Sequence, residues 1–121
     1  MDSVPVIYIE DEDTVATLFR LALAPRGVTV LHIADTTPET LEQLDTPDFQ
    51  AARAVFIDQW IGGMNGIELA RVLREKGDNR PFFLLTAGEN PNPQLLRELT
   101  VTYLRKPIKD YDQLAIQLRN S

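Results

Sequence analysis

The sequence contains no cysteine and a single histidine, His32. The lack of cysteine excludes disulfide bonds and thiolate metal sites, and one histidine cannot form a cluster of imidazole ligands. Basic residues are also few: 12 lysines and arginines stand against 18 acidic residues, which gives a formal net charge of −6. Nucleic-acid backbones and anionic membranes attract proteins with a basic face, so we expect this chain to bind neither directly.

Long hydrophobic runs are absent as well. No apolar stretch approaches the roughly 18 residues that a membrane crossing needs, and we expect no signal peptide before Val4. The chain has 121 residues, of which 44% are hydrophobic and 25% are charged, as in an ordinary globular domain. We therefore expect residues 1–121 to form a single domain in the cytoplasm.

Short apolar runs alternate with segments of helical periodicity along the chain. The runs predict strands at residues 6–9, 28–33, 54–57, 82–85 and 101–104. The periodic segments predict helices at residues 15–23, 38–44, 66–76, 94–99 and 110–119, and Thr46-Pro47-Asp48 is expected to end the second helix. Five strand–helix units in succession predict a doubly wound (βα)5 fold of the α/β class, in which helices cover both faces of a five-stranded parallel sheet.

Polar residues follow four of the five predicted strands. The run 54–57 is too apolar to have a face in water, which predicts a central strand, and Asp58 ends it. The residues that follow the first, fourth and fifth strands are Glu10 and Asp11, Thr86, and Lys106. Ligands of open parallel sheets bind beyond the carboxyl ends of the strands, so we expect these side chains to meet at one edge.

This set would hold three carboxylates, a hydroxyl and an ammonium group. Two like charges about 4 Å apart repel by roughly 4 kcal/mol at an effective dielectric constant of 20, so the carboxylates need a compensating cation. Oxygen ligands without imidazole or thiolate suit a hard ion such as Mg²⁺. Taken singly, each residue also fits a structural role: Glu12 and Asp13 are expected to cap the following helix, and Asp58 alone would fit a turn before two glycines.

Five segments, taken in order, resemble the receiver domain of two-component response regulators. They are Ile9-Glu10-Asp11-Glu12, Phe56-Ile57-Asp58, Met64-Asn65-Gly66, Leu85-Thr86-Ala87 and Tyr103-Leu104-Arg105-Lys106-Pro107. The resemblance runs from about Val4 to the C-terminus and implies a flavodoxin-like, CheY-like fold. It also implies a signalling domain that catalyses only its own phosphorylation and dephosphorylation.

The resemblance assigns roles to particular residues. It implies that Asp58 accepts a phosphoryl group from a sensor histidine kinase or a phosphotransfer protein. It further implies that Mg²⁺ or Mn²⁺ is held by Glu10, Asp11, Asp58 and the backbone carbonyl of Trp60. Thr86 and Lys106 would bind the phosphoryl oxygens, and Tyr103 would turn inward when Thr86 moves. The peptide bond before Pro107 would be cis. Phosphorylation would switch contacts with an effector protein that the sequence does not name, or within a homodimer.

The sequence departs from the family pattern in the loop after Asp58. Gly62 and Gly63 stand where a proline is usual, so we expect a looser loop there. Two other functions stay open. Asp11-Glu12-Asp13-Thr14-Val15 resembles the first motif of haloacid-dehalogenase-like phosphatases, with Asp11 as nucleophile, although the chain is short for that fold and no acidic pair follows Lys106. A receiver-like module that binds partners without being phosphorylated is the second alternative, and the sequence leaves open whether the domain stands alone or is part of a longer regulator.

Overall fold

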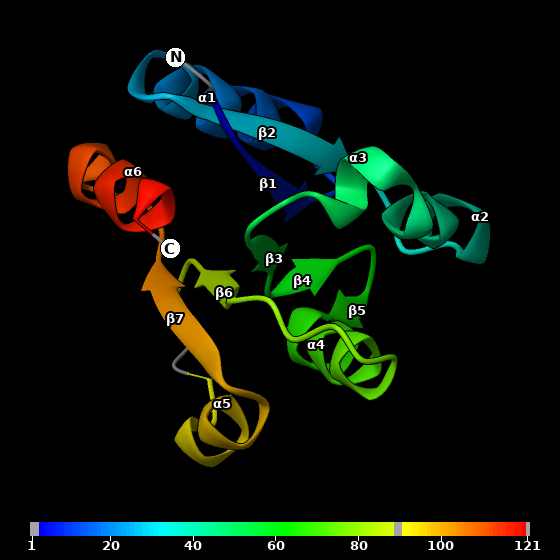
Figure 1. Ribbon diagram of the computed structural model, residues 1–121. Coiled ribbons are helices and arrows are strands. Elements are labelled where there is room, and N and C mark those ends of the chain that lie inside the picture. Colours follow the sequence, from blue (N-terminus) through cyan, green and yellow to red (C-terminus); the bar gives the residue numbers. More distant parts are fainter. Residues whose placement is uncertain (1–2, 89–90, 121) are drawn as a thin grey trace.

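A five-stranded parallel sheet forms the centre of the protein, in a computed structural model that describes residues 3–88 and 91–120 (Figure 1). Its strands are β1 (Val4–Ile9), β2 (Val28–Ile33), β3 (Val55–Asp58), β6 (Phe82–Thr86) and β7 (Val101–Arg105), arranged in the order β2-β1-β3-β6-β7. All four pairings are parallel. The five predicted strands are confirmed, and β3 occupies the central position that its apolar sequence predicted.

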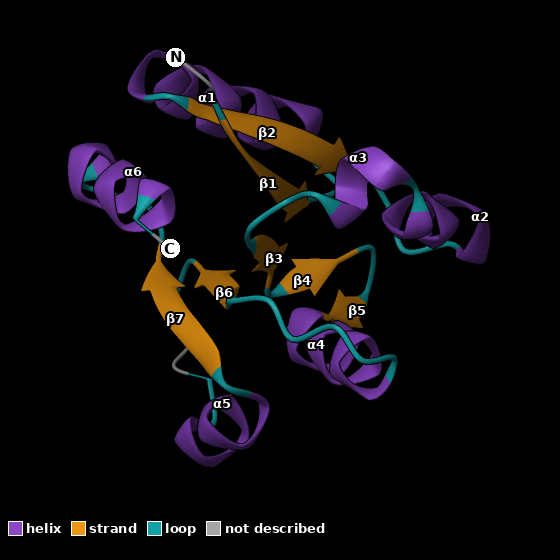
Figure 2. Ribbon diagram, in the orientation of Figure 1, coloured by secondary structure: helices purple, strands orange, loops and turns teal. Residues whose placement is uncertain are grey.

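Helices cover both faces of this sheet (Figures 1 and 2). One face packs against α1 (Asp13–Leu23) and α6 (Tyr111–Arg119). The other packs against α2 (Pro38–Leu41), α3 (Pro47–Gln50), α4 (Gly66–Glu75) and α5 (Pro93–Leu99). Two 3₁₀ turns, η1 (Ala24–Arg26) and η2 (Glu42–Asp45), complete the connections. In the described parts of the chain, no helix has both the length and the apolar character that a membrane crossing requires.

Alternation along the strands divides the core into two clusters. On β1, Val6 and Tyr8 belong to the cluster under α1 and α6, whereas Ile7 and Ile9 belong to the cluster on the opposite face. Successive side chains of a strand point to opposite faces, so a strand covered on both sides has to be apolar at every position. In β3 and β6 the polar residue is therefore confined to the carboxyl end, where Asp58 and Thr86 lie.

The second predicted helix is shorter and more broken than its sequence suggested. Residues 38–44 form α2 and most of η2, and Thr46 then has extended backbone, so the prediction that the second helix ends at Thr46-Pro47-Asp48 is confirmed. Pro47 begins a further short helix, α3, which the sequence did not predict. Proline favours the first turn of a helix because it lacks the N–H group that would be unpaired there. Pro38 and Pro47 both occupy this position. The predicted place of two acids at the start of α1 is confirmed, because Glu12 is the N-cap residue and Asp13 lies in the first turn, although Glu12 forms no side-chain capping hydrogen bond.

The loop after β3 forms a small hairpin that the sequence pattern did not predict. Strands β4 (Trp60–Ile61) and β5 (Met64–Asn65) pair antiparallel around Gly62 and Gly63, which have φ angles of +54° and +88°. Glycine adopts positive φ without steric cost, so a glycine pair suits a two-residue hairpin turn. The segment expected to be loose is thus a regular turn. Asn65 then caps α4, its side-chain oxygen accepting a hydrogen bond from the Ile67 N–H at 3.0 Å.

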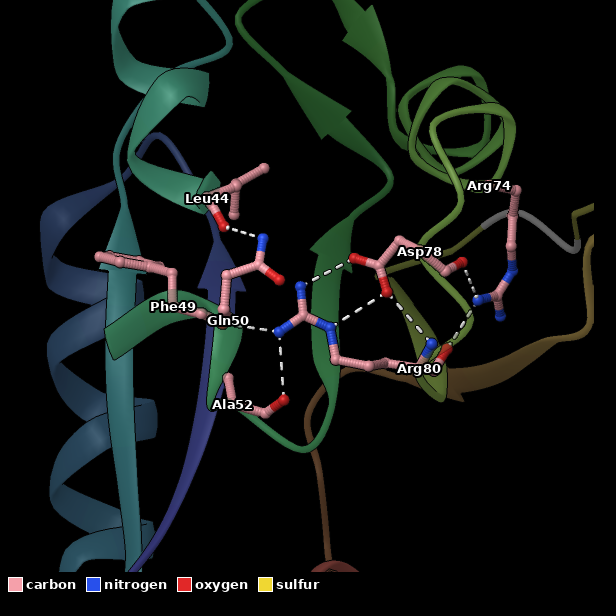
Figure 3. A network of polar contacts seen from close by, with 7 residues as sticks. All are labelled: Leu44, Phe49, Gln50, Ala52, Arg74, Asp78 and Arg80. Carbon is pink, nitrogen blue, oxygen red and sulfur yellow. Dashed lines mark hydrogen bonds and ion pairs between the residues drawn. The ribbon is translucent and has the colours of Figure 1, made fainter. Parts of the chain in front are cut away.

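Near the amino ends of β3 and β6, Arg80 joins three segments of the chain (Figure 3). Its Nη1 donates to the carbonyls of Phe49 and Ala52, at 2.6 and 3.1 Å. Its Nε and Nη2 donate to the carboxylate of Asp78, at 3.0 and 2.8 Å. Although burial alone would raise the pKa of Asp78, hydrogen bonds and the charge of Arg80 hold it below its usual value. This network ties α3 and the start of β3 to the segment before β6.

Arg74 extends the network toward β7 (Figure 3). Its guanidinium donates to the backbone carbonyls of Asp78 and Arg80, at 2.8 and 2.7 Å. It also donates to the carbonyls of Leu99 and Thr100, which close α5 and precede β7. The guanidinium carbon lies 3.7 Å from the centroid of the Phe82 ring. Two arginines therefore bind backbone carbonyls of several segments near the amino ends of β3 and β6.

Candidate functional site

The carboxyl edge of the sheet brings four of the predicted residues together. The parallel register pairs Ile9 with Ile57 and Asp58 with Leu85, so Glu10 follows β1 next to the end of β3. Thr86 ends β6, and its carbonyl accepts a hydrogen bond from the Lys106 N–H at 2.8 Å. The ends of β1, β3, β6 and β7 thus meet at one place, as the sequence predicted from the polarity of the residues that follow them.

Asp58 and Lys106 form an ion pair through Oδ1 and Nζ. Both side chains are largely withdrawn from water, with 13% of Asp58 and 25% of Lys106 exposed. Within residues 3–88 and 91–120, Asp58 Oδ1 is buried and accepts no hydrogen bond beyond this ion pair. A buried carboxylate oxygen is costly without a positive partner. The ammonium group therefore supplies the compensating charge that a cluster of carboxylates requires.

Glu10 lies beside this pair and is only 2% exposed. Its Oε2 lies 3.6 Å from Lys106 Nζ and accepts a hydrogen bond from the Tyr8 hydroxyl at 3.2 Å. Its Oε1 accepts a hydrogen bond from the Glu12 N–H, also at 3.2 Å. Burial, followed by the neighbouring Asp58 carboxylate, raises the pKa of Glu10 to about 7. Two carboxylates thus share a poorly solvated space with one lysine.

Tyr8 is a residue of this site that sequence reasoning missed. From the sequence it counts only as part of an apolar strand, yet its hydroxyl reaches the Glu10 carboxylate. Burial, followed by the charge of Glu10, raises the pKa of Tyr8, so the hydroxyl keeps its proton and can donate it to a hydrogen bond. The signal was present in the spacing, because residues two apart in a strand point to the same face.

Asp11 lies apart from the other two acids. Its side chain is exposed, and Oδ2 accepts a hydrogen bond from the Gly62 N–H at 3.0 Å, which joins the end of β1 to the hairpin turn. Across the part of the chain that the structure describes, no three His, Cys, Asp or Glu side chains converge to form a ready metal-binding cluster. Glu10 and Asp58 are therefore the two acids that already face each other.

The backbone after Asp58 follows a tightly packed path. The Gln59 N–H donates to the Leu85 carbonyl at 2.8 Å, and the Gly66 N–H donates to the Gln59 carbonyl at 2.6 Å. A Cβ atom on Gly66 would overlap with the backbone carbonyl of Asp58 and would lie 2.9 Å from Ile57 Cγ2. Only glycine permits this approach, so Gly66 fixes the position of the chain just beyond the acid.

The other predicted site residues surround this centre. Thr86 is buried at the end of β6. Tyr103 is half-buried on β7, and its buried hydroxyl has no hydrogen-bond partner in the described residues. Trp60 begins the hairpin with 53% of its surface exposed. The peptide bond between Lys106 and Pro107 is cis, as the resemblance implied.

The donor set at this edge fits a hard divalent cation. Mg²⁺ keeps several of its waters and usually binds through one or two carboxylates, so it does not need a cage of protein ligands. Glu10 and Asp58 offer two adjacent carboxylates, and burial, followed by the Asp58 carboxylate, raises the pKa of Glu10. A cation at this position would reduce their mutual repulsion.

Comparison with known proteins agrees with this geometry. The family model for the response regulator receiver domain matches residues 6–118. The chain is 31% identical over 117 residues to "Response regulator MprA" of Mycobacterium ulcerans, covering 93% of this chain and 48% of that protein. It is 30% identical over 113 residues to "Regulator of RpoS" of Escherichia coli K12, covering 90% of this chain and 32% of that protein. The chain thus spans about half or less of the length of these curated relatives.

Solved structures show the same fold. A CheY-like response regulator receiver domain from Methylobacillus flagellatus aligns with a TM-score of 0.79 and 23% identity, and 98% of each chain is covered. A receiver domain protein from Clostridium thermocellum aligns with a TM-score of 0.78 and 22% identity, covering 97% of this chain and 92% of that one. The flavodoxin-like prediction is therefore confirmed. The chain belongs to the response regulator receiver domain family, whose members are signalling domains rather than classical enzymes.

Proposed function

We propose that this chain is the phosphoacceptor of a two-component phosphorelay and that Asp58 receives the phosphoryl group. The observation that carries the proposal is the Asp58–Lys106 ion pair beside Glu10, at the edge where the parallel strands end. A phosphoryl group brings negative oxygens to this point, and Lys106 is the cation that would attract them. The donor would be a sensor histidine kinase or a phosphotransfer protein.

In the proposed reaction, the phosphoryl group moves from a histidine of the donor protein to Asp58 of this chain. A carboxylate oxygen of Asp58 attacks phosphorus, the P–N bond of a donor phosphohistidine breaks, and an acyl phosphate forms on Asp58. Such transfers depend mainly on positioning and on neutralising the charge of the phosphoryl oxygens. Lys106 would move from the Asp58 carboxylate toward these oxygens, and the Thr86 hydroxyl would bind one of them. Tyr103 would then follow Thr86 inward.

We further propose that Mg²⁺ or Mn²⁺ assists this transfer. Glu10, Asp11, Asp58 and the Trp60 carbonyl would hold the ion, and Asp11 would exchange its hydrogen bond with Gly62 for a place near the metal. When bound, the cation supplies positive charge to the phosphoryl oxygens. The protein residues hold the acid in place, and Gly66 keeps the chain behind it fixed.

The two alternative functions fit the geometry less well. A phosphatase of the haloacid-dehalogenase type would need Asp11 as nucleophile, but Asp11 is exposed and hydrogen-bonded to the hairpin, whereas the ion pairs of Lys106 in the described residues are with Glu10 and Asp58. A binding module that is never phosphorylated would have no use for a buried ion pair at Asp58. We propose that phosphorylation instead changes contacts with an effector protein or within a homodimer, in the cytoplasm and without direct binding to nucleic acid.

Acetyl phosphate tests this function without the unknown kinase. Incubation with acetyl phosphate and Mg²⁺ should add the mass of one phosphoryl group to the wild type and none to Asp58→Asn. Chelation of the metal by EDTA should prevent the addition. An unmodified wild type would contradict the proposed function, and so would a modified Asp58→Asn variant.

A further inference from the structure

Tyr8 is buried in the core next to the site. Only 1% of its surface is exposed, and its ring packs against Phe19 with centroids 4.5 Å apart. Phe19 in turn lies edge-on to Phe56 of the central strand at 5.1 Å. The phenol ring therefore belongs to the rigid core under α1 and α6, and only its hydroxyl reaches the edge where the chemistry takes place.

The hydroxyl of Tyr8 contacts one atom of the site, the Oε2 of Glu10, at 3.2 Å. The other carboxylate oxygen, Oε1, is held by the Glu12 N–H. Each oxygen of Glu10 thus has a donor on a fixed part of the protein, one on the core and one on the backbone. Lys106 lies 3.6 Å from Oε2, but its closer partner is Asp58, so it is a weaker restraint on Glu10.

We propose that Tyr8 is a positioning residue, which orients the Glu10 carboxylate for the divalent cation; this inference rests on the proposed function. A phenylalanine would fill the same volume between Phe19 and the strand, so the core does not require the hydroxyl. What the hydroxyl adds is a hydrogen bond to a carboxylate that faces Asp58. Groups that orient metal ligands in this way commonly change metal affinity by about 10- to 100-fold when removed.

Tyr8→Phe tests the inference directly. Following Trp60 fluorescence during Mg²⁺ titration, we expect the half-saturating Mg²⁺ concentration to rise about tenfold in the variant. At saturating Mg²⁺, the rate of phosphorylation by acetyl phosphate should return to within about twofold of the wild-type rate, because the hydroxyl of Tyr8 donates to Glu10 and not to the reacting carboxylate of Asp58. Tyr111→Phe is the matched control: Tyr111 also packs on Phe19, but it has no hydrogen bond to Glu10 or Asp58 in the described residues. It should bind Mg²⁺ as the wild type does.

A double-mutant cycle separates positioning from a general effect on the core. In the Glu10→Gln background, Tyr8→Phe should have no further effect on Mg²⁺ affinity, since the carboxylate on which it acts is absent. Equal additional losses in both backgrounds would overturn the inference, and so would an unchanged affinity in Tyr8→Phe. If the wild type gave no response to Mg²⁺, the proposed metal site would fail, together with the role of Tyr8 in it.

A second measurement does not depend on the folding of the Tyr8→Phe variant. Three tyrosines, Tyr8, Tyr103 and Tyr111, can be labelled with 3-fluorotyrosine and observed by ¹⁹F NMR. In the Tyr103→Phe/Tyr111→Phe protein only the Tyr8 resonance is left, and Mg²⁺ should shift it with the same half-saturating concentration as the Trp60 signal. A resonance that stays in place while Trp60 responds would show that Glu10 binds the ion without Tyr8, and would overturn the inference while leaving the proposed function intact.

Discussion

Lys106, just beyond β7, forms an ion pair with Asp58, at the end of β3, and strand β6 lies between the two strands that carry them. The contact therefore links the carboxyl ends of β3 and β7 across the strand between them, β6. The Asp58 carboxylate is thus paired with the same ammonium group that would attract an incoming phosphoryl group. We expect phosphorylation to replace this internal ion pair by one between Lys106 and the phosphoryl oxygens.

Replacing Lys106 by alanine should impair phosphorylation more than folding. The rate with acetyl phosphate should fall about 100-fold, because a charge that stabilises the transferring oxygens is lost. Mg²⁺ should bind more tightly, since a competing cation is gone. Lys109→Ala is a suitable control, because Lys109 is exposed and near in sequence. A Lys106→Ala protein that is phosphorylated at the wild-type rate would count against the assigned role.

Asp11 and Asp13 should differ sharply in their effect on metal binding. Asp11→Ala should weaken Mg²⁺ binding about tenfold or more, measured by Trp60 fluorescence, because a proposed ligand is lost. Asp13 lies in the first turn of α1, where it favours the helix only through the helix dipole, so Asp13→Ala should cost about 0.5 kcal/mol of stability. Its Mg²⁺ affinity should be unchanged. Equal affinity in the wild type and Asp11→Ala would remove Asp11 from the metal site.

Gly66→Ala should unfold or strongly destabilise the protein. The added methyl group would overlap with the Asp58 carbonyl, and this backbone cannot move without breaking the hydrogen bond between Gly66 and Gln59. We expect a loss of about 3 kcal/mol in urea denaturation. Gly88→Ala is the matched control, because an added Cβ atom meets nothing within 4 Å there and φ is not positive. Similar stabilities for both variants would mean that the close approach behind Asp58 is not a constraint.

The Asp78–Arg80 pair predicts a pH-dependent contribution to stability (Figure 3). The pKa of Asp78 is lowered in the folded state, so the folded protein binds the proton less readily than the unfolded chain. Its contribution is complete above the unfolded pKa of about 4 and is lost as the pH falls through the lower folded pKa. Asp78→Asn should therefore cost about 2 kcal/mol at pH 7 and progressively less below pH 4.

Urea denaturation at several pH values measures this difference. Asp48 is an exposed acid in the first turn of α3, and Asp48→Asn should differ from the wild type by no more than about 0.5 kcal/mol at any pH. A destabilisation of Asp78→Asn that stays constant from pH 7 down to pH 2 would show that the charge of Asp78 is not what stabilises the network.

The fold could be predicted because the apolar sequence of its strands limits where each strand can lie in the sheet. Residues 54–57 have to be covered on both faces, and a strand of this kind ending in Asp58 can hardly lie anywhere but in the centre of a parallel sheet. The connections were harder to predict. Pro47 fits either the end of one helix or the first turn of the next. The strands on either side of Gly62-Gly63 have two residues each, which is too short for an alternating pattern to appear.

The site could be predicted as a set of residues but not as a set of contacts. Glu10, Asp58, Thr86 and Lys106 follow from the polarity of the strand ends. That Lys106 pairs with Asp58 and that Asp11 turns to Gly62 depend on distances of a few ångströms, which strand order does not fix. Tyr8 could not be predicted as a site residue, because a tyrosine in the run Val6-Ile7-Tyr8-Ile9 is also a common residue of an apolar core. Only the position of its hydroxyl in the structure shows the contact with Glu10.

The most direct test of the proposed function is to identify the residue that carries the phosphoryl group. After incubation with acetyl phosphate and Mg²⁺, borohydride reduces an aspartyl phosphate to homoserine, and mass spectrometry of peptides locates the altered residue. If Asp58 is the phosphoacceptor, homoserine should be found at Asp58 alone. Homoserine at Asp11 would support a phosphatase, and an unaltered protein would support a module that is never phosphorylated; either result would contradict the role proposed for Asp58.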